Sequence, residues 1–116
     1  MLQKEVTNGL IIAQPWIGKI LSGEKMWEMR STNTKIRGPF ALIEKGTGTI
    51  VGTASLKEVL GPFDDNGIVA NQEKHRVTLD QIGKWRYAWV LEDVARLETP
   101  IHYKHRSGAV KWVKLS

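Results

Sequence analysis

Lys25, Glu28 and Arg30, three charged side chains that include both signs, lie close together in the segment GEKMWEMR at residues 23–30. The segment alternates as a β-strand does, and in a strand Glu28 and Arg30 are neighbours on one face because they are two residues apart. Strict alternation would place Lys25 on the other, apolar face, where a lysine head group is rarely left unpaired. We therefore expect Lys25 to belong to the turn before the strand and to reach toward Glu28.

Such a trio can perform chemistry. A lysine held in a cleft can lose its proton and act as a base or nucleophile, which is the role that Lys25 would have. Glu28 could relay protons, and Arg30 could hold a phosphate or carbonyl oxygen. The alternative is a structural salt bridge on a barrel rim, and spacing alone favours it because ion pairs are more common than sites.

The elements around the cluster predict how it is positioned. Residues 14–23 are typical of a short helix, since Pro15 suits the first helical position and a glycine suits the residue just past the end. The strand at residues 25–30 follows directly. Farther along, residues 40–44 and 49–56 read as strands joined by a glycine-containing turn, which predicts a hairpin.

The second half of the chain adds short elements. The segment TLDQ that starts at Thr78 matches a capping box, and the pair Thr99-Pro100 is expected to interrupt a strand. The expected elements are a turn at 64–67, a polar surface loop to residue 76, a helix at 78–84, a strand from 87 toward 97 and a strand at 109–115. This pattern predicts an α+β fold that is mainly β, a barrel with α insertions.

Composition narrows the classes of function. At 116 residues the chain is expected to form a single domain, 1–116, and its net charge of +5 favours polyanions. There are no cysteines, which excludes disulfides and thiolate ligation and points to a reducing, cytoplasmic compartment. No stretch approaches the ~20 apolar residues of a membrane span, so we expect no membrane partner. After Glu98 the only charged residues besides histidines are basic: Lys104, Arg106, Lys111 and Lys114.

The run Gly23-x-Lys25-x-x-Glu28-x-Arg30 resembles the signature of the ASCH domain family, which belongs to the PUA-like superfamily. The similarity extends from Leu10 to Leu115. It includes a helix that begins at Pro15-Trp16, the segment Tyr87–Leu91, the pattern Pro100-x-x-Tyr103 and the pattern Gly108-x-x-x-Trp112. The resemblance implies a PUA-like mixed β-barrel of about five or six strands with two or three short helices. It also implies a cleft lined by the lysine, glutamate and arginine of the signature.

From this resemblance we expect an RNA- or nucleotide-binding protein whose partner is RNA, a nucleoside or a nucleotide. Family members that look similar also include hydrolases of N4-acetylcytidine, ribonucleases and coactivator modules, so a hydrolase and a protein-interaction module are the alternatives. The amidohydrolases use a lysine, a threonine three residues later and a distant glutamate. Here Lys25 matches the lysine, Glu28 replaces the threonine, and His75 falls at the glutamate position with Glu73 nearby.

Two further sets of residues are candidates for binding. Among the five tryptophans, four lie on apolar stripes and are assigned to the core, whereas Trp85 lies at a helix end between basic residues and is the best candidate for exposure. It could stack on a base, but a half-buried structural role is the favoured alternative. Lys104, Arg106 and Ser107 lie in a polar loop that could clamp a phosphate, with His105 assisting.

The sequence predicts neither a metal nor another cofactor. His102 and His105 are three residues apart, but no nearby carboxylate completes a set of metal ligands. The turn at 64–67 lacks the later glutamate of a calcium loop, and no phosphate-binding glycine loop is present.

Overall fold

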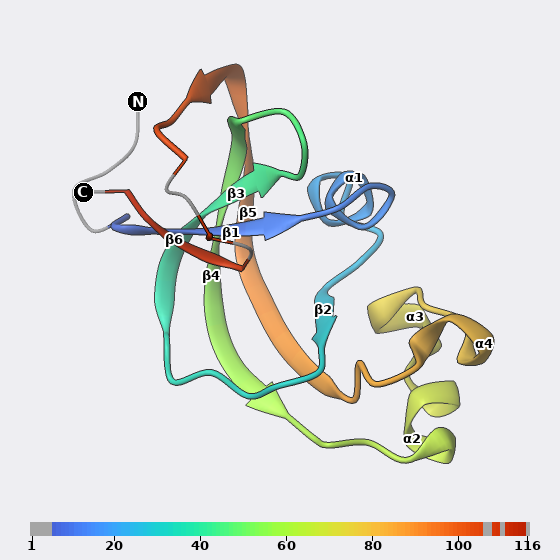
Figure 1. Ribbon diagram of the computed structural model, residues 1–116. Coiled ribbons are helices and arrows are strands. Elements are labelled where there is room, and N and C mark those ends of the chain that lie inside the picture. Colours follow the sequence, from blue (N-terminus) through green and yellow to red (C-terminus); the bar gives the residue numbers. More distant parts are fainter. Residues whose placement is uncertain (1–5, 106–107, 110, 116) are drawn as a thin grey trace.

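The computed structural model describes residues 6–105, 108–109 and 111–115, and it consists of one curved sheet with short helices beside it (Figure 1). The strands are β1 (Asn8–Ile12), β2 (Trp27–Arg30), β3 (Gly38–Glu44), β4 (Thr49–Leu60), β5 (Tyr87–His102) and β6 (Trp112–Lys114). The helices are α1 (Trp16–Leu21), α2 (Asp65–Ala70), α3 (Gln72–His75) and α4 (Leu79–Ile82).

The six strands form a half-barrel in the order β2-β5-β4-β3-β1-β6. Only β1 and β3 pair in parallel, and every other neighbouring pair is antiparallel. The mainly β class and the six strands agree with the expectation from the sequence. The sheet has two open edges, at β2 and β6, so main-chain hydrogen bonds do not close it into a full barrel.

The core lies inside the curve of the sheet and continues on its outer face. Leu10, Phe40, Leu42 and Trp89 are among the buried residues of the inner cluster. Ile43 belongs instead to an outer cluster that also contains the buried residues Val6, Ala41, Ile50 and Val113. Because side chains of a strand alternate between faces, β3 is buried on both sides and forms the centre of the domain.

The helices lie on the β2 side of the sheet (Figure 1). The predicted helix at 14–23 is confirmed as α1, and the capping box between Thr78 and Gln81 is present at α4. The prediction of a surface loop up to residue 76 was wrong, because α2 and α3 occupy that segment. Asp64 caps α2 by accepting a hydrogen bond from the main-chain nitrogen of Gly67 at 2.8 Å, a role that the turn pattern concealed.

Several strands differ from those predicted: β2 begins at Trp27, β3 begins at Gly38 and β4 continues to Leu60. β1 was not expected, and it forms because its apolar run pairs with the buried strand β3. β5 continues through Pro100, which the sequence suggested would interrupt it, and its pairing with β4 resumes at Ile101 and His102. The final strand covers only Trp112–Lys114 of the expected 109–115. Among the described residues, no helix is long and apolar enough to cross a membrane.

Gly52 of β4 marks a point where the sheet leaves no room for a side chain. A Cβ atom there would lie 2.6 Å from the carbonyl oxygen of Ala95 and 2.7 Å from a methyl group of Leu21. We expect Gly52→Ala to lower the free energy of unfolding by roughly 1–3 kcal/mol, because the backbone must shift to make room. Urea denaturation measures this change.

Gly18→Ala is the matched control. A Cβ atom at Gly18 meets only the end of the flexible Gln14 side chain, and alanine favours the helical conformation of α1. The control should therefore keep or slightly raise stability. A Gly52→Ala protein as stable as the wild type would contradict the close packing of β4 against β5.

Candidate functional site

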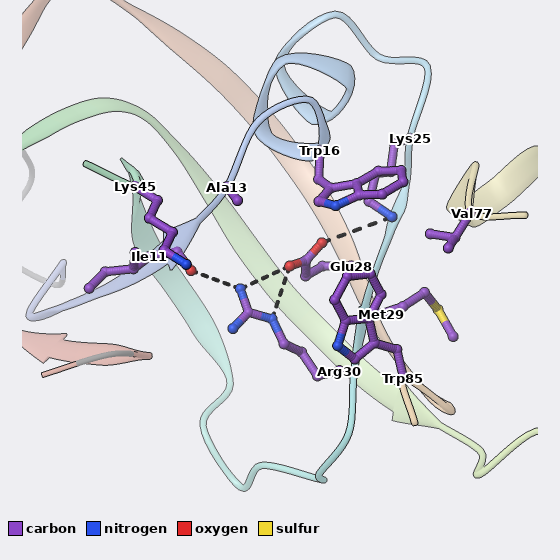
Figure 2. A pocket seen from close by; sticks show the side chains of 10 residues that line it. All are labelled: Ile11, Ala13, Trp16, Lys25, Glu28, Met29, Arg30, Lys45, Val77 and Trp85. Carbon is purple, nitrogen blue, oxygen red and sulfur yellow. Dashed lines mark hydrogen bonds and ion pairs between the residues drawn. The ribbon is translucent and has the colours of Figure 1, made fainter. Parts of the chain in front are cut away.

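A cavity of about 180 Å³ opens at the seam between β1 and β2 (Figure 2). β2 is one edge of the sheet and β1 lies next to the other edge, with β5, β4 and β3 between them, and the curvature brings β1 and β2 together. The residues that line the cavity are Ile11, Ala13, Trp16, Lys25, Glu28, Met29, Arg30, Lys45, Val77 and Trp85.

Glu28 and Arg30 form a tight ion pair on β2, as their spacing predicts. Arg30 Nη2 lies 2.8 Å and Nε 2.9 Å from the same carboxylate oxygen, Oε2 of Glu28. Arg30 Nη2 also donates to the main-chain oxygen of Ile11 on β1 at 2.8 Å (Figure 2). The pair therefore spans the seam, and it leaves the other carboxylate oxygen, Oε1, without a hydrogen bond from the described residues.

Lys25 lies in the turn before β2 and is almost completely buried, with 1% of its surface exposed. Its Nζ atom donates one hydrogen bond, to the main-chain oxygen of His75, and lies 3.9 Å from Oε1 of Glu28. The ring of Trp16 lies 5.3 Å from the same nitrogen. Burial, opposed by the charge of Glu28, lowers the pKa of Lys25 to about 8.

Two tryptophans form aromatic walls of the pocket. Trp16, which the sequence assigned to the core, is only half-buried and meets Trp85 edge to face at 6.2 Å between ring centres. Trp85 is 37% exposed, somewhat more than the half-buried position that the sequence favoured. A cavity of about 150 Å³ can hold a benzene ring, so this pocket has room for one small planar ring.

His75, at the position of the distant glutamate in the amidohydrolases, does not line the pocket. Its Nδ1 atom accepts a hydrogen bond from the nitrogen of Val77 at 3.0 Å, so Nε2 carries the proton and donates to the oxygen of Ile68 at 2.7 Å. Burial lowers the pKa of this ring. His75 therefore links α2 to the segment that follows α3, and only its main-chain oxygen reaches Lys25.

Several lining groups could not be found from the sequence. Lys45 follows β3 and faces the pocket across from Trp16 (Figure 2), and it had seemed only part of a hairpin turn. Val77 is supplied by the segment between α3 and α4. The oxygen of Ile11 is a main-chain group that every residue has, so no pattern of side chains could have pointed to it.

The phosphate-binding loop predicted farther along the chain is a separate region. Lys104 is exposed and lines another hollow, and Arg106 and Ser107 lie outside the described residues. In the part of the chain that the structure describes, no group of three or more histidine or acidic side chains is arranged to hold a metal ion.

Comparison with known proteins agrees with the architecture. The model of the ASCH domain matches residues 10–101. No curated protein matches the chain significantly.

Three crystal structures of an ASCH protein from Zymomonas mobilis are similar to the chain. The wild-type protein is 16% identical with a TM-score of 0.67, and the match covers 82% of this chain and 72% of that one. A tyrosine-to-phenylalanine mutant is 17% identical with a TM-score of 0.67, covering 82% and 74%. A serine-to-alanine mutant is 15% identical with a TM-score of 0.73, covering 94% and 87%. At these identities the likeness establishes a shared fold.

The burial of Lys25 makes stability depend on pH. The unfolded chain binds this proton with the ordinary pKa of 10.5 and the folded chain with a pKa of about 8. Protonation therefore favours the unfolded state. Lys25 lowers the free energy of unfolding most below pH 8, and this cost decreases as the pH rises to 10.5. We expect Lys25→Met to raise the free energy of unfolding at pH 7 by about 1–4 kcal/mol, because it removes a buried charge.

Denaturant titrations at pH 7 and pH 9.5 measure this effect. The advantage of Lys25→Met over the wild type should shrink at the higher pH, whereas the exposed control Lys57→Met should change stability little at either pH. A Lys25→Met protein less stable than the wild type at pH 7 would show that the ammonium group stabilises the fold.

Proposed function

The chain belongs to the ASCH domain family, and from this premise we propose that it binds RNA or a nucleotide by holding one base in the cavity between β1 and β2, which we call the base pocket. The observation that carries the proposal is the buried ammonium of Lys25, which makes one hydrogen bond to the described residues although it has three donors. Buried charges are costly to stability unless they are well paired. A ligand that supplies the missing acceptors would offset the cost of burying this lysine.

The polar groups of the pocket suit the edge of a nucleobase. Lys25 offers donors, and Oε1 of Glu28 offers an acceptor 3.9 Å away. A base edge that presents a carbonyl oxygen beside an amino or imino group matches this pair, because carboxylates accept from amino groups and lysines donate to carbonyl oxygens. Arg30 holds Glu28 in place, so the acceptor is oriented before the ligand enters.

The aromatic walls supply the remaining contacts. Trp16 and Trp85 present indole rings to a cavity that fits one planar ring, and stacking of a base on an aromatic side chain is worth ~1–3 kcal/mol. Lys45 at the same cavity adds a positive charge for a phosphate. Binding should therefore weaken as salt increases, because cations compete for the phosphate.

We expect Lys25→Met to weaken binding of RNA and nucleotides at low salt by at least about tenfold, because it removes the charged donors from the pocket. Isothermal titration calorimetry with nucleoside monophosphates and a mixed RNA oligonucleotide measures the loss. Lys57→Met, which removes an exposed lysine of β4, is the control for net charge. Because Lys25→Met is expected to be the more stable protein, lost binding is not explained by unfolding.

Absence of any affinity at low salt would refute the proposal. So would equal binding by the wild type and by a protein in which both Lys25 and Arg30 are alanine, provided that circular dichroism shows it to be folded.

One observation favours a second candidate function, a hydrolase that acts on a modified nucleoside or on RNA. A pKa of about 8 allows a fraction of Lys25 to be a neutral amine near neutral pH, as a general base must be. With an amide substrate, Lys25 would take a proton from a water molecule as the oxygen of that water attacks the carbonyl carbon. Glu28 would then carry that proton to the leaving amine as the carbon–nitrogen bond breaks.

If this hydrolysis occurs, its rate should rise with pH through about 8 as Lys25 loses its proton, and Lys25→Met should abolish it. Incubation with N4-acetylcytidine and with a mixed RNA pool, followed by chromatography, measures the products. No turnover of either substrate between pH 6 and pH 9 would exclude this activity and leave the binding function as the role of the pocket.

A further inference from the structure

Two more hollows continue from the base pocket along the surface. The second hollow, of about 440 Å³, shares Ile11 and Lys45 with the base pocket. The third hollow, of about 470 Å³, shares Tyr103 with the second. The three cavities therefore form a row in which Lys45 stands at the first junction and Tyr103 at the next.

The row follows one end of the sheet. Thr49 pairs with His102, so the turn between β3 and β4 lies beside the end of β5 (Figure 1). Tyr103 follows directly and donates a main-chain hydrogen bond to the oxygen of Gly48 at 3.4 Å. The sheet therefore holds the segments that contain Lys45 and Tyr103 next to each other.

The second hollow offers an aromatic and apolar wall. The half-buried ring of Tyr103 packs against the outer core cluster, with Ile43 and Ala109 also lining this hollow. The hydroxyl group of Tyr103 lies 3.0 Å from Nδ1 of His105, and the two rings meet at 70°. Such a wall suits the face of a second planar base.

Positive charge follows the same row. Lys45 lines the first two hollows, and Lys104 and Lys114 line the third. The acid of the second hollow, Glu44, has its Oε2 atom 3.1 Å from the amide nitrogen of Gln14, which partly satisfies it. Cations spaced between aromatic walls are the arrangement with which proteins track a phosphate backbone beside stacked bases.

We infer that the row binds single-stranded RNA or DNA of about three nucleotides, with one base in the base pocket, the next against Tyr103 and the third nucleotide beside Lys104 and Lys114. The inference rests on the proposed function of the base pocket, and it makes a nucleic-acid strand, not a free nucleoside, the preferred ligand. The strand is single because a base that enters a closed pocket must be unstacked from its neighbours. Lys45, at the first junction, contacts the phosphate that joins the first two nucleotides.

Calorimetry with unlabelled oligonucleotides of one to four nucleotides tests this inference. Affinity for the wild type should rise about tenfold from one to two nucleotides and again from two to three, and little from three to four. Tyr103→Leu keeps the apolar packing without the aromatic face, so it should lose about tenfold for the dinucleotide but bind the mononucleotide normally. Tyr103→Phe keeps the ring and should bind as the wild type does.

Salt dependence tests the role of Lys45. Lys45→Met should reduce the slope of log affinity against log salt for the trinucleotide by about 0.7, the value for one phosphate contact to a single strand. Lys57→Met should leave the slope unchanged, because Lys57 is an exposed residue of β4 that lines none of the three hollows.

The outcomes separate this inference from the proposed function. If the mononucleotide binds in a Lys25-dependent manner and longer strands bind no tighter, the row is not a binding track and the base pocket stands alone. If no nucleotide of any length binds, the proposed function fails as well. If an acidic peptide such as hexaglutamate binds as tightly as the trinucleotide, the row attracts charge only, and the inference is overturned.

Discussion

The side chain of Arg30 closes a barrel that the backbone leaves open. Hydrogen bonds between strands end at β2, and the strand that faces it across the gap, β1, lies near the other end of the sheet. Arg30 bridges this gap by holding Glu28 with two nitrogen atoms and the oxygen of Ile11 with one of them. Paired strands would fill the gap between β1 and β2, whereas a side chain that bridges it leaves space. The base pocket occupies that space. The fold and the site thus depend on the same contact.

The charges at the gap are not balanced for stability. Arg30 pairs with one oxygen of Glu28, whereas Lys25 is buried with one hydrogen bond to the described residues and a carboxylate oxygen 3.9 Å away. The desolvation of the Lys25 ammonium outweighs its attraction to Glu28, and the pKa of Lys25 is lowered as a result. A group that costs stability in the free protein and is suited to a ligand is typical of a functional site, where stability and activity are opposed.

The sequence predicted the parts of this site that depend on local spacing. The helix, the turn and the strand around Lys25, Glu28 and Arg30 follow from periodicity and a glycine stop, and the resemblance of this run to a family signature identified the fold. What the sequence could not supply comes from distant segments. The oxygen of Ile11 and the side chain of Lys45 reach the pocket only because β1 pairs in parallel with β3. The helices α2 and α3 were missed because polar residues and a capping aspartate resemble a loop when their buried partners are unknown.

The sole hydrogen-bond partner of Lys25 among the described residues is the main-chain oxygen of His75. A carbonyl group is the same whichever side chain its residue carries, so substitutions along the insert between β4 and β5 do not delete this acceptor as long as the backbone keeps its path. The insert also contributes Val77 and Trp85 to the pocket wall. Changes of side chain in the insert can therefore alter that wall without removing the acceptor that holds the lysine.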